Sequence, residues 1–202
     1  MTSRLIPVLT ATLLLAACAG LPAPQTISQN IYLLDAQATI PAASVKHDLV
    51  LAVSTPQARP GFDTAEMVYV QQPYELNYFV ANRWAAAPAR LLEPLLLQSL
   101  EQSGGFRAVV PTADAIRGDV RLETELVRLQ QDFSVRPSRV QVTLRAQLVD
   151  VRHKRMLAVK QFDETEVATS DNAYGGVGAA NRALQRLLNE LTRFCIAETA
   201  SQ

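Results

Sequence analysis

Few residues in this sequence have the types and spacing that phosphate or metal chemistry needs. The glycine-rich run 175–178 precedes a helical pattern and could hold a phosphate at a helix N-terminus. The run has no Walker lysine followed by Ser or Thr, and no full dinucleotide fingerprint. We therefore interpret 171–178 as a plain loop that leads into a helix. His47 and His153 lack metal-ligand spacing, so the sequence predicts no metal and no cofactor.

Carboxylates two residues apart on a strand share a face and could act as an acid–base pair. Asp163, Glu164 and Glu166 lie in such a run, and a solvated strand face is the simpler interpretation of it. The sequence also contains no Gly-x-Ser-x-Gly nucleophile elbow. We therefore predict that the protein is not an enzyme and has no catalytic residues.

One cysteine stands where a lipid could be attached. A positive residue within 1–4 and an apolar run over 5–17 precede Cys18. The run is shorter than the roughly 20 residues of a transmembrane helix and fits a secretory signal. Leu15-Ala16-Ala17-Cys18 resembles the lipobox of bacterial lipoproteins, in which the thiol is lipidated and the chain is cut just before it. The alternative is an ordinary signal peptide that contains a cysteine by chance.

The lipobox defines the expected organisation of the chain. We expect a lipoprotein signal peptide over 1–17, a lipidated N-terminus and tether over 18–30, and one domain over 31–202. The mature protein would be anchored to a membrane and face the periplasm. Ala19, rather than Asp, follows the cysteine. By resemblance to the sorting rule of Gram-negative lipoproteins, this favours the outer membrane and leaves inner-membrane retention open.

Composition restricts the class of protein further. The chain is 49% hydrophobic, which is ordinary for a globular domain. Its 19 basic and 19 acidic side chains cancel, and this balance argues against a nucleic-acid partner. Cys195 is the one other cysteine, and it lies in an apolar helical pattern. We interpret it as a small buried hydrophobic residue rather than a nucleophile.

Hydrophobic periodicity predicts a single domain of the α/β (more narrowly α+β) class, with a mainly antiparallel or mixed sheet packed against about two helices. Alternating apolar and polar residues are clearest in 140–148, and a polar turn over 152–155 leads into the next strand. We expect helices over 88–100 and 178–197, and strands over 47–53, 67–71, 75–80, 106–110, 120–127, 140–148 and 156–167.

The segment 76–88 joins a predicted strand to a predicted helix and holds the only tryptophan. In the simpler interpretation Trp84 anchors the helix against the sheet, because large aromatic side chains dominate protein cores. In the second interpretation Tyr78, Arg83 and Trp84 form a partner contact, since these residue types are enriched at interface hot spots. The strands over 67–80 could also offer an edge to a partner strand.

Several segments form an ordered set across nearly the whole mature chain: the lipobox at Cys18, then 32–34, 49–53, 78–88, 91–100, 105–110, 131–133, 148–150, 155–158 and 179–184. This set resembles the ABC-type transport auxiliary lipoprotein component family, which accompanies MCE-type lipid transporters and includes the Pqi-type lipoprotein. The resemblance implies a non-enzymatic subunit that helps an MCE-domain protein, with its separate ABC permease and ATPase, to move lipids across the envelope. It also allows a homo-oligomer, as a ring of copies.

Two other functions stay open at this point. The chain could be a general outer-membrane lipoprotein that supports envelope or cell-wall assembly without any transporter. It could also be a periplasmic carrier that encloses lipid in its own cavity, although the strands have wet faces and show no excess of apolar surface.

Overall fold

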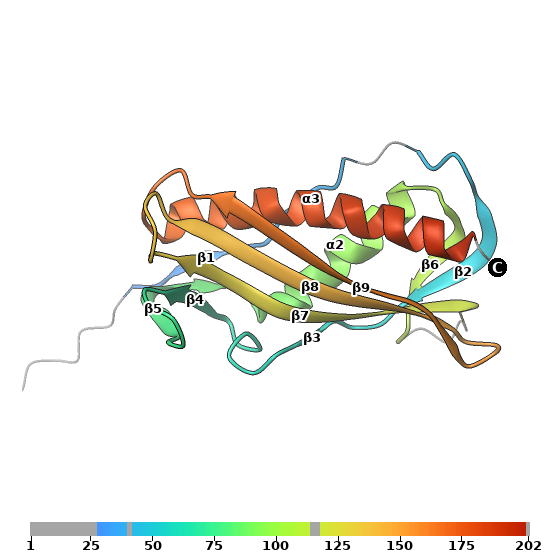
Figure 1. Cartoon of the computed structure of the whole chain (residues 1–202), viewed down its shortest axis with the longest axis horizontal. Helices are drawn as coiled ribbons and strands as arrows, with labels where there is room; N and C mark the ends of the chain where they lie inside the picture. Colours follow the sequence, from blue (N-terminus) through green and yellow to red (C-terminus); the bar gives the residue numbers. More distant parts are fainter. Residues whose placement is uncertain (1–27, 40–41, 114–117, 201–202) are drawn as a thin grey trace, which may run out of the picture.

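The computed structural model describes residues 28–39, 42–113 and 118–200, which form one α+β domain. Within these residues a mixed sheet of nine strands packs against two helices, which lie together on one side of it (Figure 1). This confirms the predicted fold class. The elements are β1 Asn30–Tyr32, β2 His47–Val53, β3 Gln57–Ala58, β4 Glu66–Val70, β5 Asn77–Trp84, α2 Pro88–Gln102, β6 Phe106–Pro111, β7 Val120–Asp132, β8 Arg139–Asp150, β9 Arg155–Val167 and α3 Ala173–Thr199.

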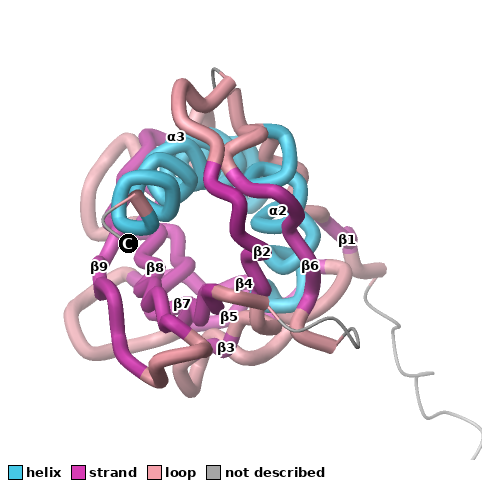
Figure 2. The backbone as a smooth tube through the Cα atoms, turned by 90° about the vertical axis from the view of Figure 1, so that its right-hand side faces the viewer, coloured by secondary structure: helices cyan, strands magenta, loops and turns pink. Residues whose placement is uncertain are grey.

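The long strand β7 organises the sheet. One of its edges pairs with β8 in antiparallel fashion, and β8 pairs with β9. Its other edge pairs in succession with three parallel strands, β2, β3 and β4. Beyond β2 lies β6, and beyond β4 lie β5 and then β1. Viewed along its length, the sheet is a curved layer that partly surrounds the helices (Figure 2).

The core lies between the sheet and the helices. Side chains that point to the inner face of β7 and β8, such as Leu122, Leu126 and Leu144, are fully buried, as the alternation of side chains along a strand predicts. Helix α3 meets them with a stripe at helical spacing that is also buried: Leu184, Leu187, Leu188 and Leu191. Burying each such leucine stabilises the fold by roughly 1.5–3 kcal/mol. This packing fixes α3 along the whole length of the sheet.

Helix α2 begins at Pro88 and continues through Pro94, which the sequence left as either a start or a kink. Pro88 sits in the first turn, where its missing N–H costs little. Pro94 lies on the exposed side of the helix, and it has no N–H to bond the carbonyl oxygen of Arg90. The helix ends before Gly104, whose positive φ of 64° suits a glycine.

The predicted loop over 171–178 is wrong, because α3 begins at Ala173. The side chain of Asn172 accepts a hydrogen bond from the backbone N–H of Gly175 at 2.9 Å and caps the helix. Two glycines in the first turn permit close packing, since a Cβ at Gly175 would overlap Ser170 and a Cβ at Gly176 would overlap Gln131. The glycine-rich run therefore serves helix packing.

The interpretation of the carboxylates as a solvated face holds for the exposed Asp163 and fails for Glu164 and Glu166. Both glutamates are half-buried against α3, and Arg186 pairs with them at 2.8 and 2.7 Å. Arg182 pairs with Glu166 at 2.7 Å. We call these four residues, Glu164, Glu166, Arg182 and Arg186, the β9–α3 clamp.

The clamp also protects a sheet edge. The guanidinium groups of Arg182 and Arg186 donate to the backbone carbonyl oxygens of Val167 and Thr165, at 3.0 and 3.1 Å. Strand β9 is the last strand on its side of the sheet, and unpaired edge groups invite pairing with other chains. The clamp therefore closes the end of β9 to another strand.

Cys195 lies on α3 and is fully buried. Burial raises the pKa of its thiol well above the usual range, because the thiolate would lose its hydration. This confirms the prediction of a small buried hydrophobic residue. Among the described residues, no helix is both long and apolar enough to cross a membrane.

Two alanine substitutions in α3 should have opposite effects. Gly175→Ala should lower the free energy of unfolding by about 1–3 kcal/mol, because its Cβ meets the backbone of Ser170. Gly178→Ala should raise it by roughly 0.5–1 kcal/mol, since the nearest atom is the flexible Arg182 guanidinium at 3.4 Å and alanine favours a helix. Urea denaturation measures both, and a stabilised Gly175→Ala protein would contradict the packing described.

The clamp should make stability depend on acid pH. The hydrogen bond from Arg182 lowers the pKa of Glu166 more than burial raises it, and Arg186 adds to the lowering. A carboxylate with a lowered folded pKa stabilises the fold above its unfolded pKa of 4.5, and this contribution is lost as the pH falls through the folded pKa. Glu166→Gln should flatten the fall of unfolding free energy below about pH 5.

The matched control for that measurement is Glu101→Gln, which changes an exposed carboxylate on α2. Urea denaturation at several pH values should show a slope like that of the unmodified protein. An equal slope for Glu166→Gln would mean that the clamp does not contribute to the pH dependence.

Candidate partner-contact surface

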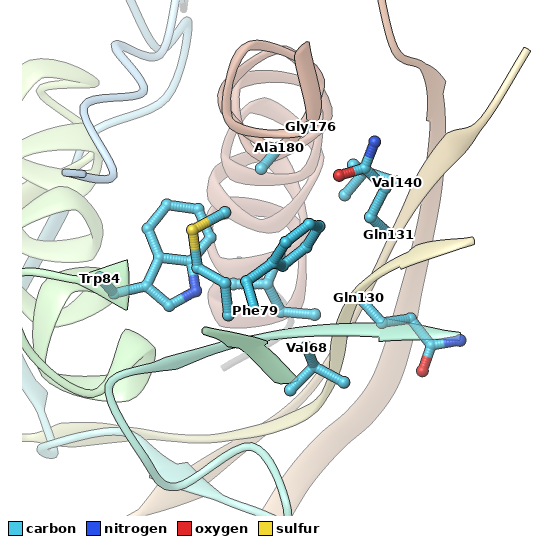
Figure 3. A pocket seen from close by; sticks show the side chains of 10 residues that line it. Val68, Phe79, Trp84, Gln130, Gln131, Val140, Gly176 and Ala180 are labelled. Atoms are coloured by element: carbon cyan, nitrogen blue, oxygen red, sulfur yellow. The ribbon is translucent and has the colours of Figure 1, made fainter. Parts of the chain in front are cut away.

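The three residues of the predicted contact lie on β5, and the structure separates Trp84 from the other two. Trp84 is 4% exposed and belongs to the hydrophobic core. Figure 3 shows Trp84 and Phe79 lining the same small pocket, below Gly176 and Ala180 of α3. Trp84 is therefore a core residue, as in the simpler interpretation, but the helix that it faces is α3 and not α2, the helix that follows it in the sequence. Because its side chain is buried, Trp84 does not offer a surface for direct contact with a partner.

Tyr78 and Arg83 are exposed on the same strand. Tyr78 is 37% exposed, and between them Val80 is 67% exposed. These three side chains line one side of an open groove that also includes Glu66 and Gln29. Arg83 is exposed, and its register partner on the neighbouring strand β4 is Glu66.

A second groove borders Tyr78 from the other side, and its floor is aromatic. The ring centroids of Tyr69 and Phe79 are 4.7 Å apart, and Phe133 lies 5.8 Å from Tyr69. These contacts join β4, β5 and the residue after β7, so the aromatic residues hold the exposed strand on the sheet. The residue patterns did not single out Tyr69 or Phe133, because their contact depends on strand pairing between distant segments.

Part of β5 also offers a free backbone edge. The prediction that the strands over 67–80 form this edge is wrong for β4, which lies between β7 and β5. On the far side of β5, β1 pairs with residues 82–84. Residues 77–81 therefore lie beyond β1, and the carbonyl oxygen of Val80 accepts from the Gln29 side chain at 3.1 Å. A partner strand could pair only with this short segment.

The turn beside this surface is held by a buried carboxylate. Asp132 accepts from the backbone N–H of Ser134 at 2.9 Å and pairs with Arg139 at 3.2 Å. Burial acts to raise the pKa of Asp132, and the bonds from Ser134 and Arg139 outweigh it and keep the pKa below its usual value. The ionised carboxylate thus stabilises the chain reversal that carries Phe133.

The surface carries groups that suit binding. It offers an aromatic hydroxyl, a guanidinium, exposed apolar side chains and a strand edge, all of which suit protein contacts. No group of three or more His, Cys, Asp or Glu residues suited to a metal ion occurs in the described part of the chain. Cys18 and its lipobox lie outside the described residues.

The described residues thus form a small α+β domain with exposed polar and apolar side chains along β5. The model of the ABC-type transport auxiliary lipoprotein component family matches residues 32–192. The chain therefore belongs to that family. A search among curated proteins returned no match.

Two solved structures show the same fold. Protein XCC0632 from Xanthomonas campestris is 21% identical with a TM-score of 0.78, and the match covers 85% of this chain and 98% of that one. The hypothetical protein CT253 from Chlamydia trachomatis is 13% identical with a TM-score of 0.56, covering 77% of this chain and 100% of that one. At these identities the likeness concerns the fold alone.

Substitutions on β5 should distinguish the buried core residue Trp84 from the exposed residue Arg83. Trp84→Ala should lower the free energy of unfolding by about 3–5 kcal/mol, because it leaves a cavity between β5 and α3. Arg83→Ala should change it by about 0.5 kcal/mol or less, since the side chain is exposed. Thermal denaturation of both variants checks this, and equal losses would place Arg83 in the folded framework.

Proposed function

We propose that this protein is a lipid-anchored, periplasm-facing auxiliary subunit of an MCE-type ABC transporter that moves lipids across the cell envelope. Membership of the transport auxiliary lipoprotein family carries this proposal. An exposed contact surface on a domain without a metal-binding group in its described part supports a role in binding rather than catalysis.

In this proposal the chain is exported and cut before Cys18, and the thiol carries the lipid. Ala19 after the cysteine favours the outer membrane as the final location. The MCE-domain protein, permease and ATPase are separate chains. The contribution of this subunit is therefore an anchor and a docking surface, and a ring of several copies is compatible with that role.

Tyr78 and Arg83 are the side chains that we assign to the contact with the MCE-domain protein. Both lie on β5 and are exposed to solvent, one on each side of Val80 in the sequence. Tyr78 and Val80 belong to the segment 77–81, which β1 does not pair with. Trp84 acts as a positioning residue, because its burial against α3 fixes the strand that carries them. A rigid strand with an exposed tyrosine and arginine lowers the entropy cost of binding.

A carrier that encloses lipid is less well supported. The small pocket between Trp84, Phe79 and Gln131 has a volume of about 10 Å³, which is room for one water molecule, and the larger groove beside Tyr78 and Arg83, about 630 Å³, is open to solvent and does not enclose a ligand. We therefore favour transport through a multi-subunit assembly over carriage of lipid in this cavity.

A photo-crosslinking amino acid in place of Tyr78 tests the proposed contact in growing cells. We expect a crosslink to an MCE-domain protein, and loss of it when Arg83→Glu is added. The same amino acid in place of Gln98, exposed on α2, is the matched control for a surface outside the contact. Crosslinks from Tyr78 to wall synthases or barrel-assembly factors would instead assign the protein to envelope assembly.

A further inference from the structure

Exposed apolar side chains gather at one end of the molecule. The described residues contain twelve large hydrophobic side chains that are exposed, and eight of them belong to β1, β5, the turn before β5, the turn after β7, the end of β9 and the start of α3. They are Ile31, Tyr74, Leu76, Tyr78, Val80, Val135, Val167 and Tyr174. Figure 1 shows these segments together at the end where the chain leaves towards its N-terminus.

Hydrogen bonds and ring contacts confirm that these segments are neighbours. The backbone N–H of Phe133 donates to Val70 at 2.8 Å, which joins the turn after β7 to the end of β4. The backbone N–H of Ser138 donates to Asp171 at 2.7 Å, which joins the same turn to the loop before α3. The rings of Tyr32 and Tyr174 lie 6.4 Å apart. We call the turns that carry Tyr74 and Val135, together with the start of α3 at Tyr174, the tip; Tyr78 and Val80 of β5 belong to the protein contact assigned above.

We propose that the tip rests in the interfacial layer of the membrane to which the lipid on Cys18 is attached, with Tyr74 and Val135 in contact with lipid. This inference rests on the lipid anchor of the proposed function. It adds an orientation, because the domain would stand on the membrane by a defined end instead of swinging freely from its tether.

The tether and the chemistry of the tip favour a membrane over a protein as the occupant. Ser28, the first described residue, lies ten positions after Cys18, and a fully extended chain of ten residue steps spans at most about 35 Å. The lipid is therefore held within reach of the tip. Tyrosine side chains such as Tyr74 and Tyr174 combine an apolar ring with a polar hydroxyl and suit the membrane–water interface.

The opposite end of the sheet has a different character. The turn between β8 and β9 contains Arg152, His153 and Lys154, and it lies at the far end of the molecule in Figure 1. Met156 near the start of β9 and Val167 at its end are eleven residue steps apart, which is roughly 36 Å along an extended strand. A domain resting on its tip would project this basic turn away from the membrane.

Site-specific fluorescence on the lipidated protein in vesicles tests the orientation. A single cysteine introduced by Tyr74→Cys, or in a second variant by Val135→Cys, would carry an environment-sensitive fluorophore. Cys195 is fully buried and would stay unlabelled in the folded protein. Met156→Cys is the matched control, because Met156 is also exposed and apolar (57%) but lies at the far end. The vesicles would contain phosphatidylethanolamine and phosphatidylglycerol, with and without nitroxide-labelled lipid.

We expect emission at Tyr74→Cys and Val135→Cys to shift to shorter wavelength and to be quenched by nitroxide lipid, while Met156→Cys stays unchanged. Protein that floats with the vesicles but keeps an aqueous spectrum at both tip positions would overturn the tip contact and leave the anchor intact. Lipidated protein that fails to float would overturn both. A shift at the tip that needs an added envelope protein would assign the tip to a protein partner and overturn the membrane contact.

Discussion

Strand β7 must satisfy backbone hydrogen bonds on both edges along 13 residues, and the rest of the fold depends on this pairing. Strand β8 follows one edge throughout, while β2, β3 and β4 divide the other edge between them. The three parallel partners arrive from separate parts of the chain, so β7 gathers segments that have no local reason to meet. Its apolar face, with Leu122 and Leu126, then receives α3 and closes the core.

The proposed contact surface depends on the strand pairing at the C-terminal end of β7. Residues 68–70 of β4 pair with residues 130–132 of β7, and β5 pairs with β4. Asp132 and Arg139 hold the reversal that follows, and Trp84 locks the end of β5 to α3. The exposed Tyr78 therefore lies on a strand fixed at several points, and binding there needs little ordering of the backbone.

The sequence predicted the elements with regular periodicity well, since β8, β9 and α2 differ from expectation by one or two residues at most ends. The predictions were wrong where contacts between residues distant in the sequence determine a helix boundary or the burial of a side chain. Helix α3 begins five residues before the predicted start, because Asn172 caps it and Gly175 packs closely on Ser170. The glycine content of this segment had favoured a loop. Glu164 and Glu166 looked like a solvated face because their arginine partners lie on α3, distant along the chain. The choice between the two interpretations of Trp84 needed the structure, which buries its side chain.

We propose that this domain works by anchoring and contact, as a subunit of a lipid-transporting ABC system. The most direct measurement is affinity purification of the tagged, lipidated protein from detergent-solubilised envelopes, with partners identified by mass spectrometry and a Cys18→Ala strain as the control for anchoring. The account predicts recovery of an MCE-domain protein together with its permease and ATPase. Recovery of wall synthases, of barrel-assembly factors or of no partner would contradict it.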